Sequence, residues 1–545
     1  MSNYLLRFVF VAPLLCLTAA ISAAEIRPDP PYLFLISAAV AAGGFFSAVL
    51  GRRIAFGLLG TALCLLPMLG AGSLSLFVAL WLLGSEVKDL AVHTPSEEPV
   101  RIAERFLLLG FLALLLSLLC SLVQAVILEA DFLILSTLFQ AGGLGRIVRY
   151  AGQSYSQWRA VPEILSGFVL AVFLAFRIVR VEREVDEKPL AALLGGLALS
   201  SVGAVFVLLM QFNDAHPLFA LNQNAFWQMV GRYSASFSDP NAFGIMAALL
   251  IPLLMVAGRG LRAWLFRSAA VLLLIVTPWS GSRTVWFGLL LWLLLLFTGM
   301  FGVRSTGALR SRGFLLVFAG FLGLAFLGFP PLNEWLDQQV DVPGLDRVLK
   351  TMHWQKGGQM LSSRLIYGRI ALAMWEQSPL IGVGLDRFYG LQEITARSIG
   401  IALEDWRDNA NNYYLQVLAE QGLIGVALTL LAFYLFALAL SGRPLQSGGA
   451  DRERTIASTP VLLLISRLTM GVLALLLLTG PHFFFDEVRF LAVIILGIGV
   501  SQVESVREKV LAFHRSILLV ATLVCPIIYS LGFANASSTM LTRGF

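Results

Sequence analysis

Charge is scarce in this sequence. Of its 545 residues, 13% are charged and 58% are hydrophobic, whereas about 25% of the residues in an average soluble domain are charged. Apolar runs recur from Leu5 to Phe533. The net charge is +6, but the basic residues lie in short loops between apolar runs rather than in one patch, so we expect no nucleic-acid partner. The composition excludes a soluble protein and makes the lipid bilayer its main solvent.

Signatures of metal, nucleotide and redox chemistry are also missing. The four cysteines all lie inside apolar segments, so neither a disulfide framework nor a thiolate metal site is indicated. The five histidines show no HxxxH or HExxH spacing, and the chain has no GxGxxG or GxxxxGK loop. We therefore expect no metal, no nucleotide and no other cofactor.

Apolar runs near the length that a spanning helix needs, about 20 residues, predict the fold class. We expect an all-α protein: a polytopic transmembrane helical bundle of about 14 to 15 spans with one long, partly helical loop. The expected parts are N-terminal transmembrane helices (1–212), central transmembrane helices (213–329), the loop (330–412) and C-terminal transmembrane helices (413–545). The fifteen runs are approximately 4–23, 32–50, 54–70, 72–85, 106–128, 160–179, 190–212, 241–258, 263–279, 284–301, 313–329, 413–440, 459–480, 489–504 and 515–533.

Basic residues predict the orientation. With a cytoplasmic N-terminus, 21 Lys and Arg residues fall in inner loops and 8 in short outer segments. The positive-inside rule selects this arrangement. The long loop, 330–412, then faces outward.

Three predicted helices that run from the outer side inward begin with polar, turn-forming sequences. These are SFSDPN (236–241), SGSR (280–283) and DNANN (408–412). Ser238 or Asp239 is the expected cap of the first helix. A helix N-terminus presents unpaired N–H groups and about half a positive charge, which favours an anion. If the three ends converge, they surround an outward-facing anion pocket.

Arginines near these sequences strengthen the prediction. Arg232 precedes the first sequence and Arg283 ends the second, and a guanidinium binds phosphate oxygens bidentately. The alternative is that such arginines reach to lipid headgroups while the polar residues only cap helices.

The outer loop also contains a predicted helix, from about Arg364 to Gln377. Arg364 and Arg369 would lie in its first two turns, where cations oppose the helix macrodipole. This placement suggests a bound anion. The competing explanation is that they pair with acids of the same loop, such as Asp337, Asp341 or Asp346.

Two further residues have both a functional and a structural interpretation. His482, with acidic neighbours between two spans, is either an outward-facing base or a residue of the interfacial aromatic belt. Arg467 lies within a predicted span, so it is either a pathway residue or part of a structural ion pair.

Four segments together resemble the O-antigen ligase and polymerase superfamily of bacterial envelope polysaccharide assembly. They are RYSASFSDPNAFG (232–244), SGSRTVWFGLL (280–290), RLIYGRIALAMWEQSPLIGVGLDRF (364–388) and NNYYLQVLAEQGLIG (411–425). The resemblance implies a glycosyltransferase of the bacterial inner membrane, with the long loop in the periplasm. It implies transfer of glycan from an undecaprenyl diphosphate carrier to an acceptor hydroxyl, without metal or nucleotide.

The same resemblance implies site residues. The arginine of the SR motif falls on Arg283 and the outer-loop arginine on Arg364, both expected to bind the donor diphosphate. Arg232 aligns with the basic residue ahead of the PN turn, and Arg369 and Asn412 join the expected diphosphate site.

One departure from the family pattern affects catalysis. Many ligases of this family have histidine before asparagine where this chain has Asn411 and Asn412, and asparagine does not accept a proton at neutral pH. Either a carboxylate or another histidine is the base, or no strong base is needed because diphosphate is a good leaving group. The candidates are Glu404, Asp405, Asp408, His353 and His482. We expect Asn411, Asp408 and His482 in the catalytic site, with Asn411 orienting the acceptor or a phosphate oxygen.

The leading hypothesis is therefore an enzyme that polymerises or ligates lipid-linked repeat units of O-antigen or exopolysaccharide. The expected partners are the lipid-linked donor, a glycan or lipid acceptor, membrane lipids, and polysaccharide flippase and chain-length or export proteins. Two alternatives remain: a non-enzymatic transporter or flippase of lipid-linked glycan, and a catalytically inactive family member in an assembly complex. The missing histidine favours polymerase over ligase.

Overall fold

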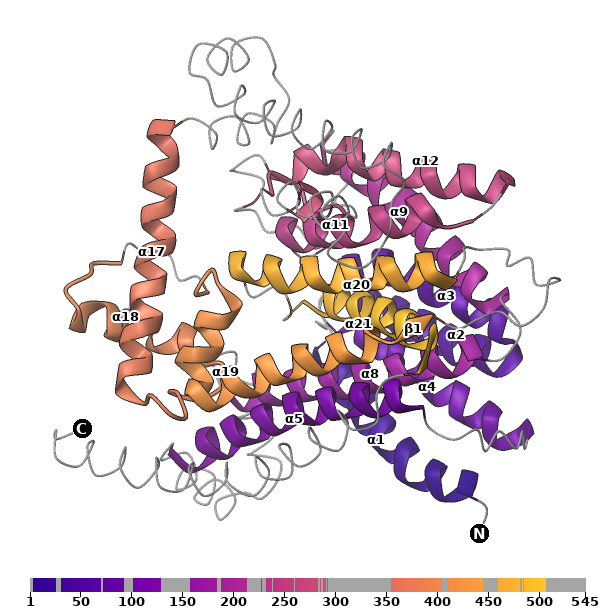
Figure 1. The fold of residues 1–545 in the computed structure, drawn as a ribbon, viewed down its shortest axis with the longest axis horizontal. Helices are drawn as coiled ribbons and strands as arrows, with labels where there is room; N and C mark the ends of the chain where they lie inside the picture. The colour runs from indigo at the N-terminus through magenta and orange to yellow at the C-terminus, as the bar shows by residue number, and fades with distance from the viewer. Residues whose placement is uncertain are drawn as a thin grey trace.

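A computed structural model shows a bundle of long helices (Figure 1). The residues it describes are 3–25, 31–69, 72–92, 101–128, 157–183, 188–212, 227, 232–237, 239–258, 260–282, 285, 288–290, 292, 354–403, 409–444, 459–480, 483 and 485–505. Over these residues the protein is almost wholly helical, and two short strands, β1 (Arg443–Pro444) and β2 (Val503–Ser505), pair antiparallel. Six described helices are long and apolar enough to cross a membrane. The predicted all-α, multi-pass membrane fold is confirmed.

Twelve of the predicted spans coincide with described helices. The other three, 284–301, 313–329 and 515–533, lie mostly or wholly outside the described residues. The helices of the first half are α1 (Asn3–Glu25), α2 (Pro31–Leu50), α3 (Arg52–Leu65), α4 (Ser73–Val92), α5 (Ile102–Leu128), α8 (Gln157–Arg183) and α9 (Lys188–Phe212). Those of the second half are α11 (Pro240–Val256), α12 (Gly260–Val276), α17 (Trp354–Gln377), α18 (Arg387–Ser398), α19 (Tyr413–Leu440), α20 (Thr459–Leu476) and α21 (Asp486–Ser501). Three 3₁₀ turns are η1 (Leu66–Leu69), η3 (Thr277–Ser280) and η4 (Leu477–Thr479).

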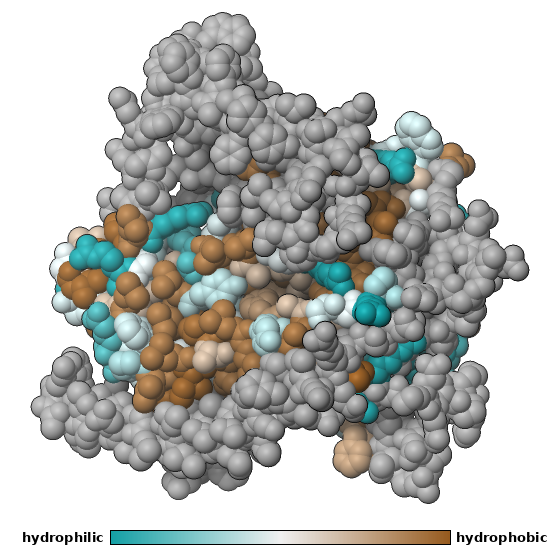
Figure 2. All heavy atoms as spheres, in the orientation of Figure 1, coloured by the Kyte–Doolittle hydropathy of each residue, from teal (hydrophilic) through white to brown (hydrophobic). Residues whose placement is uncertain are grey.

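The sequence of each helix explains its depth in the bundle. Helices α11 and α21 are apolar on every side and almost all of their residues are buried, as expected for central helices. By contrast, α12 exposes one apolar face, where Leu261, Trp264 and Leu265 are 61 to 78% exposed. Exposed hydrophobic side chains also cover much of α5 and α19 (Figure 2). Such faces suit contact with lipid.

Helices α17 and α18 lie at one end of the bundle, and α17 runs across the direction of α5, α19 and α20 (Figure 1). Both belong to the segment predicted as the outer loop. The predicted start of α17 was wrong, because the helix begins at Trp354 rather than near Arg364. Arg364 and Arg369 therefore lie well inside the helix. Their position gives no macrodipole argument for a bound anion.

Arg467 has a structural environment at the far end of α19. Its Nε donates to the carbonyl oxygen of Leu440 at 2.6 Å and its Nη2 to that of Gly442 at 2.7 Å. These contacts satisfy carbonyl groups that a helix C-terminus leaves unpaired. The described contacts of Arg467 are thus those of a helix cap, and neither predicted role, a pathway residue or half of an ion pair, is needed to explain its position.

Candidate functional site

Arg232 is buried between two of the polar sequences and is 4% exposed. Its Nε donates to the carbonyl oxygen of Ser280 at 2.9 Å, and its Nη2 donates to Oδ1 of Asn241 at 2.7 Å. Its guanidinium also lies 4.7 Å from the ring centre of Trp227, within the range of a cation–π contact. Arg232 therefore joins the SFSDPN and SGSR sequences.

Asp239 caps α11, which is one of the two predicted caps. Its backbone is extended, and its Oδ1 accepts a hydrogen bond from the Asn241 N–H at 2.6 Å while Pro240 occupies the first turn. Burial raises the pKa of Asp239, and the charge of Arg232 opposes that rise. The side chain of Asn241 thus accepts a hydrogen bond from Arg232, and its backbone N–H donates one to Asp239. The three residues are therefore joined by hydrogen bonds.

Arg489, in the first turn of α21, is a second buried arginine at this end of the bundle, and it is 6% exposed. Its Nη2 lies 3.2 Å from Oδ1 of Asp486, and its Nε donates to the carbonyl oxygen of Phe483 at 3.2 Å. The other carboxylate oxygen of Asp486 accepts a hydrogen bond from Ser75 of α4. On α8, a Cβ at Gly167 would lie 2.1 Å from the Arg489 guanidinium. A larger residue at position 167 would therefore displace the Arg489 guanidinium from this position.

A buried carboxylate, Glu487, connects the two arginine environments. It is 6% exposed, and its Oε1 has no hydrogen-bond partner among the described residues. Both Asp239 and Arg489 lie close enough to act on it electrostatically. We refer to Arg232, Asp239, Glu487 and Arg489 together as the polar end.

A cleft adjoins Arg489 and encloses about 440 Å³, its open mouth included. Ser117, Tyr413, Gln421 and Thr429 contribute polar atoms to its wall, where the Ser117 hydroxyl donates to Oε1 of Gln421. The rest of the wall is apolar and comes mainly from α5 and α8, at Leu114, Leu118, Ile164 and Phe168. A cation beside an apolar wall suits an amphiphile with an anionic head.

The third polar sequence leads into α19, whose first residue, Tyr413, also lines the cleft. Asn412 caps α19 by accepting a hydrogen bond from the Leu415 N–H at 3.1 Å. Asn411 has φ 52°, a left-handed conformation that asparagine tolerates better than most residues. Its N–H donates to Oδ1 of Asn409 at 2.8 Å. The turn before α19 is therefore built from its own asparagines.

The arginines of α17 lie on the surface. Arg364 and Arg369 are both exposed. Between them, Gly368 faces Leu415 in the first turn of α19, because a Cβ at Gly368 would lie 3.6 Å from the Leu415 side chain. Residues four apart share a helix face, so Arg364 lies on the face that packs against the start of α19. Arg369 is turned about 100° away from Gly368.

The PLIGVG and EQGLIG sequences pack directly against each other. Four backbone hydrogen bonds of 2.8 to 3.1 Å join 379–384 to 419–424. Gly382 has φ +71° and Gly422 has φ +65°, and α19 is kinked at Gly422. A Cβ on Gly382 would lie 2.3 Å from the backbone of Glu420, and one on Gly422 would lie 2.4 Å from that of Leu380. We call this reciprocal packing the glycine lock.

Glu420, next to the glycine lock, accepts hydrogen bonds from both α18 and α19. Its side chain is 1% exposed. Its Oε1 accepts hydrogen bonds from the Phe388 N–H at 3.3 Å and from Nε2 of Gln416 at 3.2 Å. Because Phe388 lies in the first turn of α18 and Gln416 in the first turn of α19, Glu420 fixes the outer helices to the start of α19.

Several predicted site residues fall outside the described residues. These are Arg283, Asp408 and His482, together with the alternative bases Glu404, Asp405 and His353. Within the described part of the chain, no group of three His, Cys, Asp or Glu side chains could hold a metal ion. The sequence analysis missed Arg489, which it counted only as an outer basic residue. The signal was present in DEVR, four residues, three of them charged, that open an otherwise apolar helix.

Comparison with known proteins gives one match. Residues 268–430 match a family model described as O-antigen ligase. The matched segment is less than a third of the chain and contains the SGSR sequence, α17, α18 and most of α19. No curated protein matches the sequence.

Proposed function

We propose that this chain, whose residues 268–430 match a family model described as O-antigen ligase, transfers lipid-linked glycan units at the outer face of the bacterial inner membrane. The family match supports a glycan-assembly enzyme of the ligase or polymerase type, and the described helices make it a multi-pass membrane protein. The proposed donor is an undecaprenyl-diphosphate-linked repeat unit. The proposed sidedness, with α17 and α18 in the periplasm, rests on the distribution of basic residues.

The observation that carries this proposal is the polar end beside the cleft. Arg489 lines a cleft whose remaining wall is largely apolar, which suits a diphosphate joined to a polyprenyl chain. The glycine lock and the face shared by Arg364 and Gly368 set α17 against the start of α19. We propose that Arg283, Arg364 and Arg489 hold the donor diphosphate with help from Arg369 and Asn412, and that Arg232 fixes the SGSR turn that carries Arg283.

In the proposed reaction the acceptor hydroxyl oxygen attacks the anomeric carbon of the donor sugar. The new glycosidic C–O bond forms as the C–O bond to diphosphate breaks, and the diphosphate leaves with that electron pair. The arginines stabilise the charge that develops on the leaving group. The hydroxyl proton passes to Asp408 or His482, or through water to the released diphosphate, while Asn411 orients the acceptor.

The proposed activity is testable with purified protein and a defined undecaprenyl-diphosphate oligosaccharide, without any energy source. We expect carrier diphosphate to be released in step with longer or newly ligated glycan. Redistribution of the intact donor across a vesicle without product would indicate a transporter instead. Neither product nor redistribution, with partner proteins supplied, would indicate an inactive scaffold.

Replacing Arg364 with Ala is expected to lower kcat/KM for the lipid-linked donor. Losing a charge-assisted contact worth about 1.5 to 3 kcal/mol corresponds to roughly a 10- to 100-fold decrease. The matched control is Arg397→Ala on α18, because Arg397 is also an exposed arginine of the outer helices and pairs with Glu393, four residues earlier on the same helix. Equal rates for wild type and both variants would remove Arg364 from the donor site.

A series at Asn411 separates its chemistry from its backbone conformation. We expect Asn411→Asp to retain more transfer activity than Asn411→Leu, because aspartate can still orient a hydroxyl. Leu is also strained at φ 52°, so Asn411→Gly provides a variant without strain and without a polar side chain. If Asp, Gly and Leu variants transfer glycan at the same rate per folded molecule, the Asn411 side chain has no part in the reaction.

A further inference from the structure

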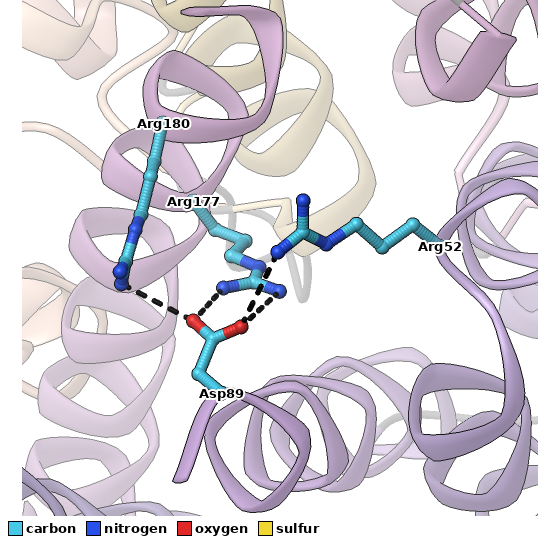
Figure 3. A network of polar contacts seen from close by, with 4 residues as sticks. All are labelled: Arg52, Asp89, Arg177 and Arg180. Atoms are coloured by element: carbon cyan, nitrogen blue, oxygen red, sulfur yellow. Dashed lines mark hydrogen bonds and ion pairs between the residues drawn. The ribbon is translucent and has the colours of Figure 1, made fainter. Parts of the chain in front are cut away.

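A second cationic cluster lies at the other end of α4, around the buried carboxylate of Asp89 (Figure 3). Arg177 of α8 holds this carboxylate with two contacts, Nη1 to Oδ2 at 2.6 Å and Nη2 to Oδ1 at 3.4 Å. Arg180 Nη1 lies 3.1 Å from Oδ2, and Arg52 Nη2 of α3 lies 3.7 Å from Oδ1. We call these four residues the Asp89 cluster.

The Asp89 cluster carries more positive charge than its own carboxylate can neutralise. Three guanidiniums around one carboxylate leave a formal charge of +2. Counting Lys88 and Glu86, the neighbouring charged residues on α4, leaves that sum unchanged. Burial lowers the pKa of Lys88, and the nearby Arg52 and Arg177 lower it further. An additional anion would relieve this repulsion.

The cluster also contains a buried donor that the described protein groups do not use. Arg177 Nε has no hydrogen-bond partner within the described part of the chain. The Arg177 side chain is 4% exposed, whereas those of Arg180 and Arg52 are 23% and 27% exposed. Buried polar groups normally have partners. The arrangement is therefore a basic cluster that is buried at Arg177 and partly exposed at Arg180 and Arg52.

The Asp89 cluster is separate from the proposed glycosyl-transfer site. On α4, Ser75 donates a hydrogen bond to Asp486, the ion-pair partner of Arg489, and Asp89 lies fourteen residues later, a separation of about 21 Å along a helix. The first turn of α3 and the last turns of α4 and α8 meet there. The cluster therefore lies where helices leave the apolar layer, which is the depth of lipid phosphate groups.

We propose that the Asp89 cluster binds a phosphate group, supplied by the headgroup of an anionic phospholipid in the leaflet opposite the polar end. Guanidiniums recognise phosphate oxygens through paired, charge-assisted hydrogen bonds. A glycerophosphodiester with an uncharged head alcohol brings one negative charge to a cluster that holds +2. A zwitterionic lipid brings an extra cation and is disfavoured.

The test uses the full-length protein, stripped of lipid in detergent and titrated with phosphatidylglycerol, phosphatidylcholine or inorganic phosphate. Bound ligand is counted by native mass spectrometry, and the thermal unfolding midpoint is followed in parallel. We expect phosphatidylglycerol to bind about tenfold more tightly than phosphatidylcholine, and Arg52→Gln or Arg180→Gln to weaken phosphatidylglycerol about tenfold, the loss of one charge-assisted contact. Both variants leave the Arg177–Asp89 pair intact.

The matched control is Arg53→Gln, which removes the same charge from the neighbouring, exposed residue of α3 and should bind phosphatidylglycerol like wild type. An equal loss in Arg53→Gln would reduce the effect to surface charge and overturn the site. Unchanged affinity in Arg52→Gln and Arg180→Gln would overturn it as well. If inorganic phosphate binds as tightly as phosphatidylglycerol and competes with it, the site takes a phosphate from solution and the lipid source is wrong.

Discussion

Alanine at Gly422 should disconnect α17 and α18 from α19 and abolish the proposed glycan transfer. An L-residue in the left-handed region costs about 1 to 2 kcal/mol, and the new Cβ would lie 2.4 Å from the backbone of Leu380. That backbone is held by the hydrogen bonds of the glycine lock, so relief of the clash breaks them. We expect the backbone strain and the broken hydrogen bonds together to weaken the docking of the outer helices by about 3 kcal/mol or more. Gly382→Ala should have the same effect, because Gly382 also has a positive φ and its new Cβ would lie 2.3 Å from the backbone of Glu420.

Limited proteolysis and thermal unfolding measure this loss, and the transfer assay measures its functional consequence. The control is Gly390→Ala on α18, where a Cβ would meet nothing within 4 Å. It should be neutral or stabilising by up to about 1 kcal/mol, because alanine favours helix. Normal protease resistance in Gly422→Ala and Gly382→Ala would show that the lock does not hold the outer helices.

The polar sequences illustrate what the amino-acid sequence can predict here. Apolar runs located most spans, because each run maps directly onto one helix in a bilayer. Asp239 was one of the two residues predicted to cap α11, since capping depends on residues adjacent in the chain. In contrast, the start of α17 at Trp354 has no strong local signal. PLIGVG and EQGLIG contributed to the family resemblance, but their mutual packing is a contact between segments about forty residues apart.

The roles of the charged residues were harder to predict from the sequence. Arg232 was expected in the anion site from its place in the sequence, yet its contacts with Ser280 and Asn241 give it a positioning role. Arg489 was counted for orientation alone, although it adjoins the cleft. The basic residues Arg52, Arg177 and Arg180 were assigned together to the inner loops, and Asp89 gathers them. The sequence predicts on which side of the membrane each basic residue lies. Only the packing of the helices shows which arginines contact the same carboxylate.

Arg489→Met is the second substitution from which we expect a large effect. It leaves Asp486 and Glu487 without the cation beside them, and removing one partner of a buried pair costs about 3 to 5 kcal/mol. If Arg489 also holds the donor diphosphate, transfer is lost in the molecules that remain folded. Thermal unfolding therefore has to be measured together with transfer rate per folded molecule.

The double variant Arg489→Met with Asp486→Asn separates the two roles. Removing the Asp486 charge should recover part of the lost stability, because asparagine can still accept the hydrogen bond from Ser75. Transfer should stay low, since the cleft still lacks Arg489. Arg467→Met is the control: it removes an arginine that caps α19 at the opposite end, so stability should fall while transfer per folded molecule is kept. Recovery of both stability and transfer in the double variant would make Arg489 a structural residue and leave donor binding to the arginines near the SGSR turn and on α17.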